Sequence, residues 1–160
     1  MPPLDGLKVV DLTRVLAGPF CAMLLGDMGA DVIKVERAGA GDMFRSMTFF
    51  AKWVGGSESP NFLAWNRNKR SIALNLKSRK VHAIIMDMAK KADVFIENMA
   101  PGTIEKLGLG WDELHRLNPR LIYAQVKGFG EDSPYEHNLA FDMIAQACGG
   151  NMAITGEAGR

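Results

Sequence analysis

Residues 7–36 constrain the fold most, because they predict a strand, a helix and a second strand with very short connections. Leu7 to Leu12 (LKVVDL) are apolar and β-branched, which favours a buried strand. Pro19 suits the first turn of a helix, and Gly29 is well placed to end it. Residues 31–36 (DVIKVE) predict the second strand. A unit this compact indicates two parallel neighbouring strands.

The remainder of the chain continues to alternate between the two kinds of element. Strands are predicted at 71–76, 93–97 and 121–126, and helices at 61–66, 81–88, 104–107, 111–117 and 139–148. In the last helix, Met143, Ile144 and Ala147 are expected to face inward. Residues 38–60 show no steady period and predict a long loop. The expected fold class is α/β: a Rossmann-like open, mainly parallel sheet of about five strands with helices on both faces.

Composition and charge exclude several function classes. The 160 residues carry a formal net charge of +1, so the overall charge does not favour binding to nucleic acid or to an anionic membrane. No apolar run approaches the roughly 20 residues that cross a bilayer, and MPPLDG lacks the features of a secretory signal. Cys21 and Cys148 lie in apolar helical contexts and are expected to be reduced, buried thiols of a cytoplasmic protein. The three histidines, His82, His115 and His137, have no metal-ligand spacing, so no metal is expected.

Ligands of such sheets bind outside the carboxyl ends of the strands. The loops predicted there are 13–19, 37–60, 98–103 and 127–139, and we expect them to converge. Loop 13–19 contains no GxGxxG motif. Its N–H groups could face an anion or a thioester carbonyl, or the loop could be only a tight connection. Arg37 could meet an adenosine phosphate or adenine, or be a solvated surface residue.

Other charged residues leave two interpretations open. Arg67, Lys69 and Arg70 could meet a diphosphate, although short basic clusters are more often simply solvated. Asp42 and Asp142 are the carboxylates with the best case for a functional role. A carboxylate in the first turn of a helix is commonly only a partner of the helix dipole, which is the default for Asp142.

Five ordered stretches resemble one known family. They are LDGLKVVDLTRVLAGPFCAMLLGDMGADVIKVERAGAGDMFR, NRNKRSIALNLKS, ADVFIENMAPGTIEKLGLGWDEL, NPRLIYAQVKGFG and FDMIAQACGGNMAITG. Together they resemble the family III CoA-transferases, the CaiB/BaiF group that includes formyl-CoA transferase and carnitine CoA-transferase. The resemblance covers essentially the whole chain. It implies a Rossmann-like sheet without the dinucleotide glycine motif, whose crevice holds coenzyme A or acyl-CoA as a substrate.

The resemblance also implies which residues bind CoA. Leu16 and Ala17 would line the pantetheine and thioester end, and Arg37 would meet the adenosine portion. The other implied contacts are Leu74, Asn75, Leu76 and Lys77 beside adenine and its phosphates, Asn98, Met99 and Ala100 in the wall after the fourth strand, Lys106 as a phosphate partner, and Leu139, Ala140, Phe141 and Asp142 beside the acyl group. Leu139 and Leu16 replace a Lys and a Gln that formyl-CoA transferase can have, which argues against an oxalate-type substrate.

The family mechanism uses an aspartate nucleophile that forms a mixed anhydride and then an aspartyl-CoA thioester. The resemblance places this aspartate beyond Arg160, so no catalytic residue is assigned within the chain. Residues 1–160 are therefore expected to be the N-terminal part of the large CoA-binding domain. The catalytic motif and a second domain are expected beyond it, and the full-length protein is expected to form an interlocked homodimer.

Two alternatives to the CoA-transferase interpretation remain. The related α-methylacyl-CoA racemases have Gly-His-Asp where this chain has Ala140-Phe141-Asp142, and Phe cannot move a proton. The base that a racemase needs is therefore missing at position 141. The other alternative is a non-catalytic CoA-binding fragment.

Overall fold

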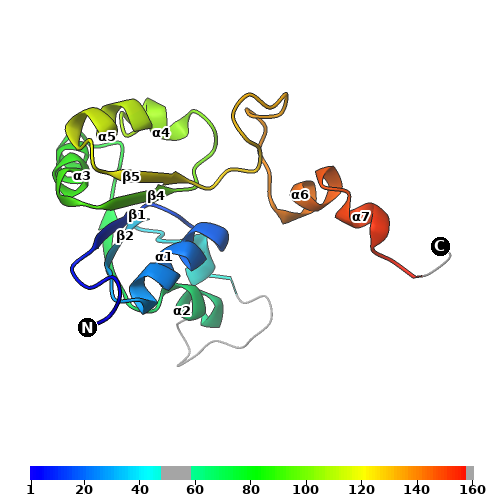
Figure 1. The fold of residues 1–160 in the computed structure, drawn as a ribbon, viewed down its shortest axis with the longest axis horizontal. Coiled ribbons are helices and arrows are strands. Elements are labelled where there is room, and N and C mark those ends of the chain that lie inside the picture. Colours follow the sequence, from blue (N-terminus) through cyan, green and yellow to red (C-terminus); the bar gives the residue numbers. More distant parts are fainter. Residues whose placement is uncertain (48–58, 158–160) are drawn as a thin grey trace.

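A five-stranded, all-parallel sheet forms the centre of the protein (Figure 1). The computed structural model describes residues 1–47 and 59–157. The strands are β1 (Lys8–Asp11), β2 (Asp31–Arg37), β3 (Lys69–Leu74), β4 (Val94–Glu97) and β5 (Ile122–Gln125), in the order β3-β2-β1-β4-β5. This is the strand order of a Rossmann-like sheet, so the predicted fold class is confirmed.

Helices cover both faces of the sheet, as predicted. The helical elements are α1 (Ala17–Asp27), the 3₁₀ turn η1 (Met43–Arg45), α2 (Pro60–Asn66), α3 (Arg79–Lys91), α4 (Thr103–Lys106), α5 (Trp111–Leu117), α6 (Asp142–Cys148) and α7 (Asn151–Ile154). Helices α3, α4 and α5 lie over one face, and α1 and α2 lie over the other (Figure 1). In the part of the chain that the structure describes, no helix combines the length and the apolar character needed to cross a membrane.

Two apolar clusters form the core, one on each face of the sheet. Val10 and Phe95 pack with Ile85 of α3, whereas Val9 packs with Ala22 of α1. Successive side chains of a strand point to opposite faces, so neighbouring residues of β1 belong to different clusters. The central strands β1 and β4 are largely buried on both sides, which explains why they are nearly continuous apolar runs rather than alternating ones.

The order of the strands reverses between β1 and β4. The chain proceeds from β1 to β2 on one side and later places β4 on the other side of β1. The connections that follow β1 and β4 therefore start from the same carboxyl edge and lead to α1 and α4 on opposite faces of the sheet. This topological switch point is where open α/β sheets bind ligands.

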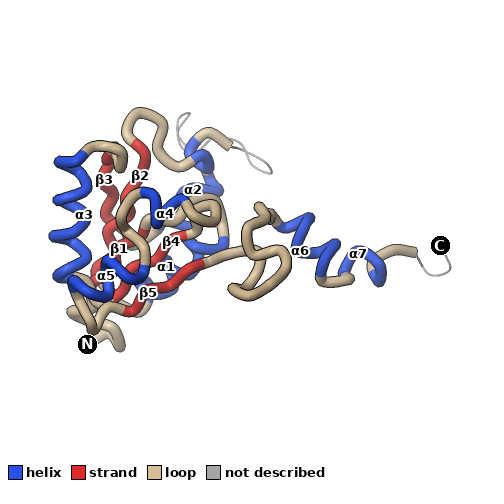
Figure 2. The backbone as a smooth tube through the Cα atoms, turned by 90° about the horizontal axis from the view of Figure 1, so that it is seen from above, coloured by secondary structure: helices blue, strands red, loops and turns tan. Residues whose placement is uncertain are grey.

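Residues 139–157 lie away from the sheet, which the sequence did not predict. Helix α6 begins at Asp142 rather than Leu139, and it packs against α7 in an arm that projects from the body (Figures 1 and 2). Met143, Ile144 and Ala147 are exposed, so the expectation that they face inward was wrong. Helical spacing identifies an apolar face, but it does not say what covers that face.

The two cysteines also differ from expectation. Cys21 and Cys148 are both exposed rather than buried. Cys21 lies on the outer side of α1, where the next residue, Ala22, is the one that enters the core. Cys148 ends α6 in the projecting arm. An apolar neighbourhood in sequence therefore did not determine the side of the helix on which each thiol lies.

Candidate functional site

The loop after β1 is joined to the loop after β4 by a reciprocal hydrogen-bonded pair. The Arg14 N–H donates to Asn98 Oδ1 at 2.9 Å, and Asn98 Nδ2 donates to the Arg14 carbonyl at 2.8 Å. An amide side chain can satisfy both main-chain groups because it carries a donor and an acceptor. The predicted convergence of these two loops is therefore correct.

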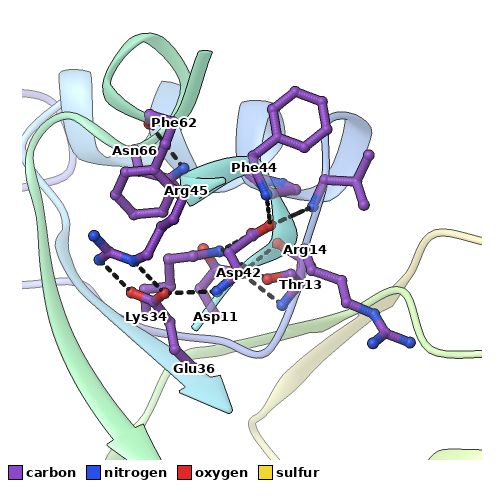
Figure 3. Close-up of polar contacts among 12 residues, drawn as sticks. Asp11, Thr13, Arg14, Lys34, Glu36, Asp42, Phe44, Arg45, Phe62 and Asn66 are labelled. Atoms are coloured by element: carbon purple, nitrogen blue, oxygen red, sulfur yellow. Dashed lines mark hydrogen bonds and ion pairs between the residues drawn. The ribbon is translucent and has the colours of Figure 1, made fainter. Parts of the chain in front are cut away.

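Two buried ion pairs lie beneath the same edge. Figure 3 shows the first of them, between Lys34 and Asp42. Lys34 Nζ is 3.0 Å from Asp42 Oδ2 and donates to the Thr13 carbonyl at 2.8 Å. Lys69 Nζ is 2.9 Å from Asp11 Oδ2, and burial lowers the pKa of Lys69 while the Asp11 charge opposes that effect. Buried ammonium groups require such partners, because an unpaired charge is costly away from water.

The carboxylate of Glu36, the residue before Arg37, is occupied by hydrogen bonds within the protein. Its carboxylate accepts two hydrogen bonds from Arg45 at 2.7 and 2.8 Å, together with bonds from the Ser71 hydroxyl and the Asp42 N–H. Burial alone raises the pKa of Glu36, but these hydrogen bonds outweigh it and lower the pKa to about 2. Glu36 is therefore ionised and occupied by Arg45, so it is not available to hold a ribose.

Arg37 lies beside this network at the carboxyl end of β2. It lines a pocket of about 270 Å³ together with Glu36, Gly39, Ala40, Gly41, Arg45, Ser71 and Ala73. Arg37 is exposed, and within residues 1–47 and 59–157 its guanidinium has no hydrogen-bond or ion-pair partner. Register pairs Arg37 with Leu74, so the loop 75–77 after β3 starts next to it.

A second pocket, of about 390 Å³, lies at the carboxyl ends of β4 and β5. Its lining comprises Pro101, Gly102, Glu105, Gln125, Lys127, Phe129, Glu131, Glu136 and His137. Lys127 Nζ lies 2.6 Å from the buried Glu97 Oε1 and donates to the Met99 carbonyl at 2.8 Å. The Met99 N–H in turn donates to Glu97 Oε2 at 2.6 Å. Glu97 and Lys127 thus hold Met99, and sequence reasoning missed both, although a buried carboxylate at a strand end requires a cation.

The residues predicted to bind CoA are only partly gathered at this edge. Leu16 and Ala17 are exposed at the start of α1, and Asn98, Met99 and Ala100 are partly buried beside that loop. Leu74 at the end of β3 and Leu76 beyond it are partly buried, whereas Asn75 and Lys77 are exposed. Lys106 is exposed at the end of α4.

The segment 139–142 lies in the arm. Leu139 and Phe141 are 69% and 73% exposed, and Ala140 is partly buried. No hydrogen bond in the described part of the chain joins this segment to the loops after β1, β2 and β4. Asp142, also exposed, accepts a hydrogen bond from Gln146 within α6.

Several sequence-based alternatives are decided by contacts. Arg67 pairs with Asp27, Lys69 is buried against Asp11, and Arg70 pairs with Asp31 at the start of β2. All three cations are therefore engaged within the chain, which argues against the diphosphate interpretation. His82 was expected on the polar side of its helix, but it is partly buried and its Nε2 lies 3.2 Å from the Gly108 carbonyl. Across the described residues, no cluster of three or more His, Cys, Asp and Glu side chains could hold a metal ion.

Comparison with known proteins identifies the family. The model of the family described as CoA-transferase family III matches residues 4–160. Succinyl-CoA:glutarate CoA-transferase of Mus musculus is 47% identical over 156 residues, which cover 98% of this chain and 35% of that protein. Acetyl-CoA:oxalate CoA-transferase of Acetobacter aceti is 47% identical over 154 residues, covering 96% of this chain and 39% of that protein.

Solved structures agree with these relatives. A CAIB/BAIF family protein from Brucella suis superimposes with a TM-score of 0.91 at 42% identity, over 99% of this chain and 42% of that chain. The chain thus spans between about a third and two fifths of the length of the proteins that it matches. The open parallel sheet without a glycine-rich dinucleotide motif and the match over nearly all residues lead to one conclusion: this chain belongs to the family III CoA-transferases.

Proposed function

We propose that this chain forms the CoA-binding part of an enzyme that transfers coenzyme A between an acyl-CoA and a free carboxylic acid. The observation that carries the proposal is Arg37: an exposed guanidinium beside a pocket at the carboxyl edge, with its neighbouring carboxylate already neutralised by Arg45. A cation that has no partner among residues 1–47 and 59–157 is available there for the negatively charged nucleotide end of CoA.

The nucleotide end is proposed to occupy the Arg37 pocket and the ends of β2 and β3. Glycine and alanine line much of this pocket, which leaves the backbone open to a flat base or to phosphate. A guanidinium can bind phosphate with two parallel hydrogen bonds or stack on an adenine ring. Leu74 ends the adjacent strand β3, and Asn75, Leu76 and Lys77 follow it. Lys106 supplies a further exposed cation.

The thioester end is proposed to lie at the start of α1. Leu16 and Ala17 are exposed there, and Asn98, Met99 and Ala100 form the neighbouring wall. The N-terminus of a helix carries partial positive charge and free N–H groups, which favour the oxyanion of a reacting thioester. Leu139, Ala140, Phe141 and Asp142 are proposed to line the acyl group once the arm that carries them packs against further protein surface.

The nucleophile is proposed to be an aspartate outside residues 1–160, which attacks the acyl-CoA thioester and carries CoA as an aspartyl thioester. We also propose a homodimer and a cytoplasmic location for the full-length protein. The exposed apolar side chains of α6 and α7 support a further contact surface of this kind. Light scattering of the purified full-length protein tests the dimer, and microscopy of a tagged protein tests the location.

The test measures CoA exchange by the full-length protein between succinyl-CoA and glutarate, the pair in the name of the mouse relative. Arg37→Ala is expected to weaken CoA binding by about tenfold, as the loss of one charge-assisted contact does. Arg70→Ala is the matched control, because Arg70 is also exposed at a strand of the same sheet but pairs with Asp31. Equal CoA affinity of the Arg37→Ala and Arg70→Ala variants would argue against this site.

The same assay separates the alternatives. Isomerisation of a 2-methylacyl-CoA without an acceptor acid would support the racemase interpretation, although Phe141 stands where that chemistry needs a base. Binding of CoA by the full-length protein with no turnover in either reaction would support a non-catalytic module. Failure of calorimetry to detect CoA binding by the wild-type protein would overturn the proposed function altogether.

A further inference from the structure

The loop between β1 and α1 has a backbone conformation that its own residues do not favour. Val15 has a φ of 74°, in the left-handed region. A β-branched side chain is an outlier there, because its Cβ substituents crowd the backbone. Such a conformation persists only when surrounding contacts determine it, and it occurs preferentially at functional sites. The question is therefore which groups hold residues 13–16.

Asn98, after β4, binds the main chain of Arg14, and the groups on either side of Arg14 are held by β2 and the loop after it (Figure 3). Lys34 Nζ donates to the Thr13 carbonyl at 2.8 Å, on one side of Arg14. The Val15 N–H, on the other side, lies 3.3 Å from both carboxylate oxygens of Asp42. Lys34 and Asp42 are themselves paired at 3.0 Å, and each side chain is only 1% exposed.

Asp42 is in turn held in place by its own neighbours. Its carboxylate accepts a hydrogen bond from the Phe44 N–H at 3.0 Å and caps the 3₁₀ turn η1. Its own N–H donates to Glu36 at 2.9 Å, within the Glu36–Arg45 network. The carboxylate therefore has a fixed position from which it can orient the loop.

We propose that the buried Lys34–Asp42 pair positions the loop that presents Leu16 and Ala17 to the thioester end of the CoA site. The proposal rests on the proposed function. The pair is too buried to touch a substrate, so it acts through the main chain of residues 13 and 15. Lys34 and Asp42 are thus positioning residues, and their effect is confined to the pantetheine end, whereas Arg37 acts at the nucleotide end.

The experiment uses the full-length protein and two thioesters, an acyl-CoA and the corresponding acyl-pantetheine, which lacks the nucleotide. The perturbation is the double variant Lys34→Met/Asp42→Asn. Removing one charge alone leaves the other buried and unpaired, whereas replacing both is often well tolerated. Ile85→Val is the matched control, because Ile85 is fully buried in the core cluster on the other face of the sheet. Unfolding by urea measures the folded fraction of each variant.

The double variant is expected to lower kcat/KM about tenfold or more with both thioesters, because a displaced loop misaligns the reacting end. Arg37→Ala is expected to lower kcat/KM with acyl-CoA and to leave acyl-pantetheine unchanged. Adding Val15→Gly to the double variant is expected to restore part of the rate, since glycine adopts positive φ without strain.

Three outcomes overturn the inference. One is a double variant with the wild-type kcat/KM for both thioesters. Another is a loss explained entirely by its folded fraction, as expected for Ile85→Val. Should the double variant fail to fold, Asp42→Glu replaces it, because this change keeps both charges and moves the carboxylate by one methylene; a wild-type rate with both thioesters then overturns the proposal. Failure of the wild-type protein itself to exchange CoA is distinct, because it removes the proposed function on which the inference rests.

Discussion

The hydrogen-bonded network around Glu36 allows a direct measurement of how much one ionised carboxylate contributes to the free energy of unfolding. Glu36→Gln keeps the shape of the side chain but removes its charge from Arg45, Ser71 and the Asp42 N–H. The pKa of Glu36 is about 2 in the folded protein, against an ordinary value of 4.5. Since each pKa unit corresponds to about 1.36 kcal/mol, the ionised carboxylate stabilises the fold by about 3 kcal/mol.

The sign of the pH dependence follows from the lowered pKa. A carboxyl group whose pKa is lower in the folded state contributes its full stability above pH 4.5, and that contribution is lost as the pH falls towards 2. The stability difference between wild type and Glu36→Gln is therefore expected to shrink from about 3 kcal/mol at pH 7 to about 1 kcal/mol at pH 3.

Urea unfolding followed by circular dichroism at pH 7, 5, 4 and 3 measures this difference. Other carboxylates titrate equally in both proteins and cancel in the comparison. Asp31→Asn is the control, because the Asp31–Arg70 pair is exposed and exposed pairs contribute little. A difference between wild type and Glu36→Gln that stays constant from pH 7 to pH 3 would refute the assignment of a strongly lowered pKa.

Three further predictions concern packing, ionisation and thiol exposure. Gly18→Ala is expected to destabilise the protein by about 1–3 kcal/mol in urea unfolding, because the new methyl group would crowd the buried Thr13 side chain; no more than about 0.5 kcal/mol of destabilisation would contradict this packing. Burial, followed by nearby carboxylates, raises the pKa of Tyr123 above its ordinary value of 10.0, so in a Tyr135→Phe variant phenolate absorbance should appear only well above pH 10. Both exposed cysteines should react rapidly with a thiol reagent in the native protein, and slow reaction until urea is added would restore the expectation that they are buried.

Local patterns in the chain predicted the five strands and the helices that cover the sheet, all within the described residues 1–47 and 59–126. The β-branched run 7–12, the turn with Pro19 and Gly29, and the second apolar run at 31–36 predicted the first parallel unit correctly. The alternation of strands with amphipathic helices then implied a parallel sheet covered on both faces. Periodicity predicts the elements here because burial of one helical face, or of both faces of a strand, requires apolar residues at regular spacing.

The arm that contains α6 and α7 shows what local sequence patterns do not predict. Residues 139–148 have the spacing of an apolar helix, and a helix is present at Asp142–Cys148. Its apolar residues are nevertheless exposed, because α6 packs against the short α7 in the arm rather than against the sheet. Which surface covers a helix depends on long-range packing, and spacing within the helix carries no information about that.

At the site, local patterns were enough to place Arg37 after the second strand, and a loop without a phosphate-binding glycine motif after the first. Which charges are available there depends on contacts between distant parts of the chain. Four charged side chains form ion pairs with partners up to 58 residues away in the chain: Lys34, Glu36, Asp42 and Lys69. The Arg37 guanidinium has no such partner among the described residues. The physical reason is that a buried charge must find a partner, and the partner is chosen by distance in space rather than by position in the sequence.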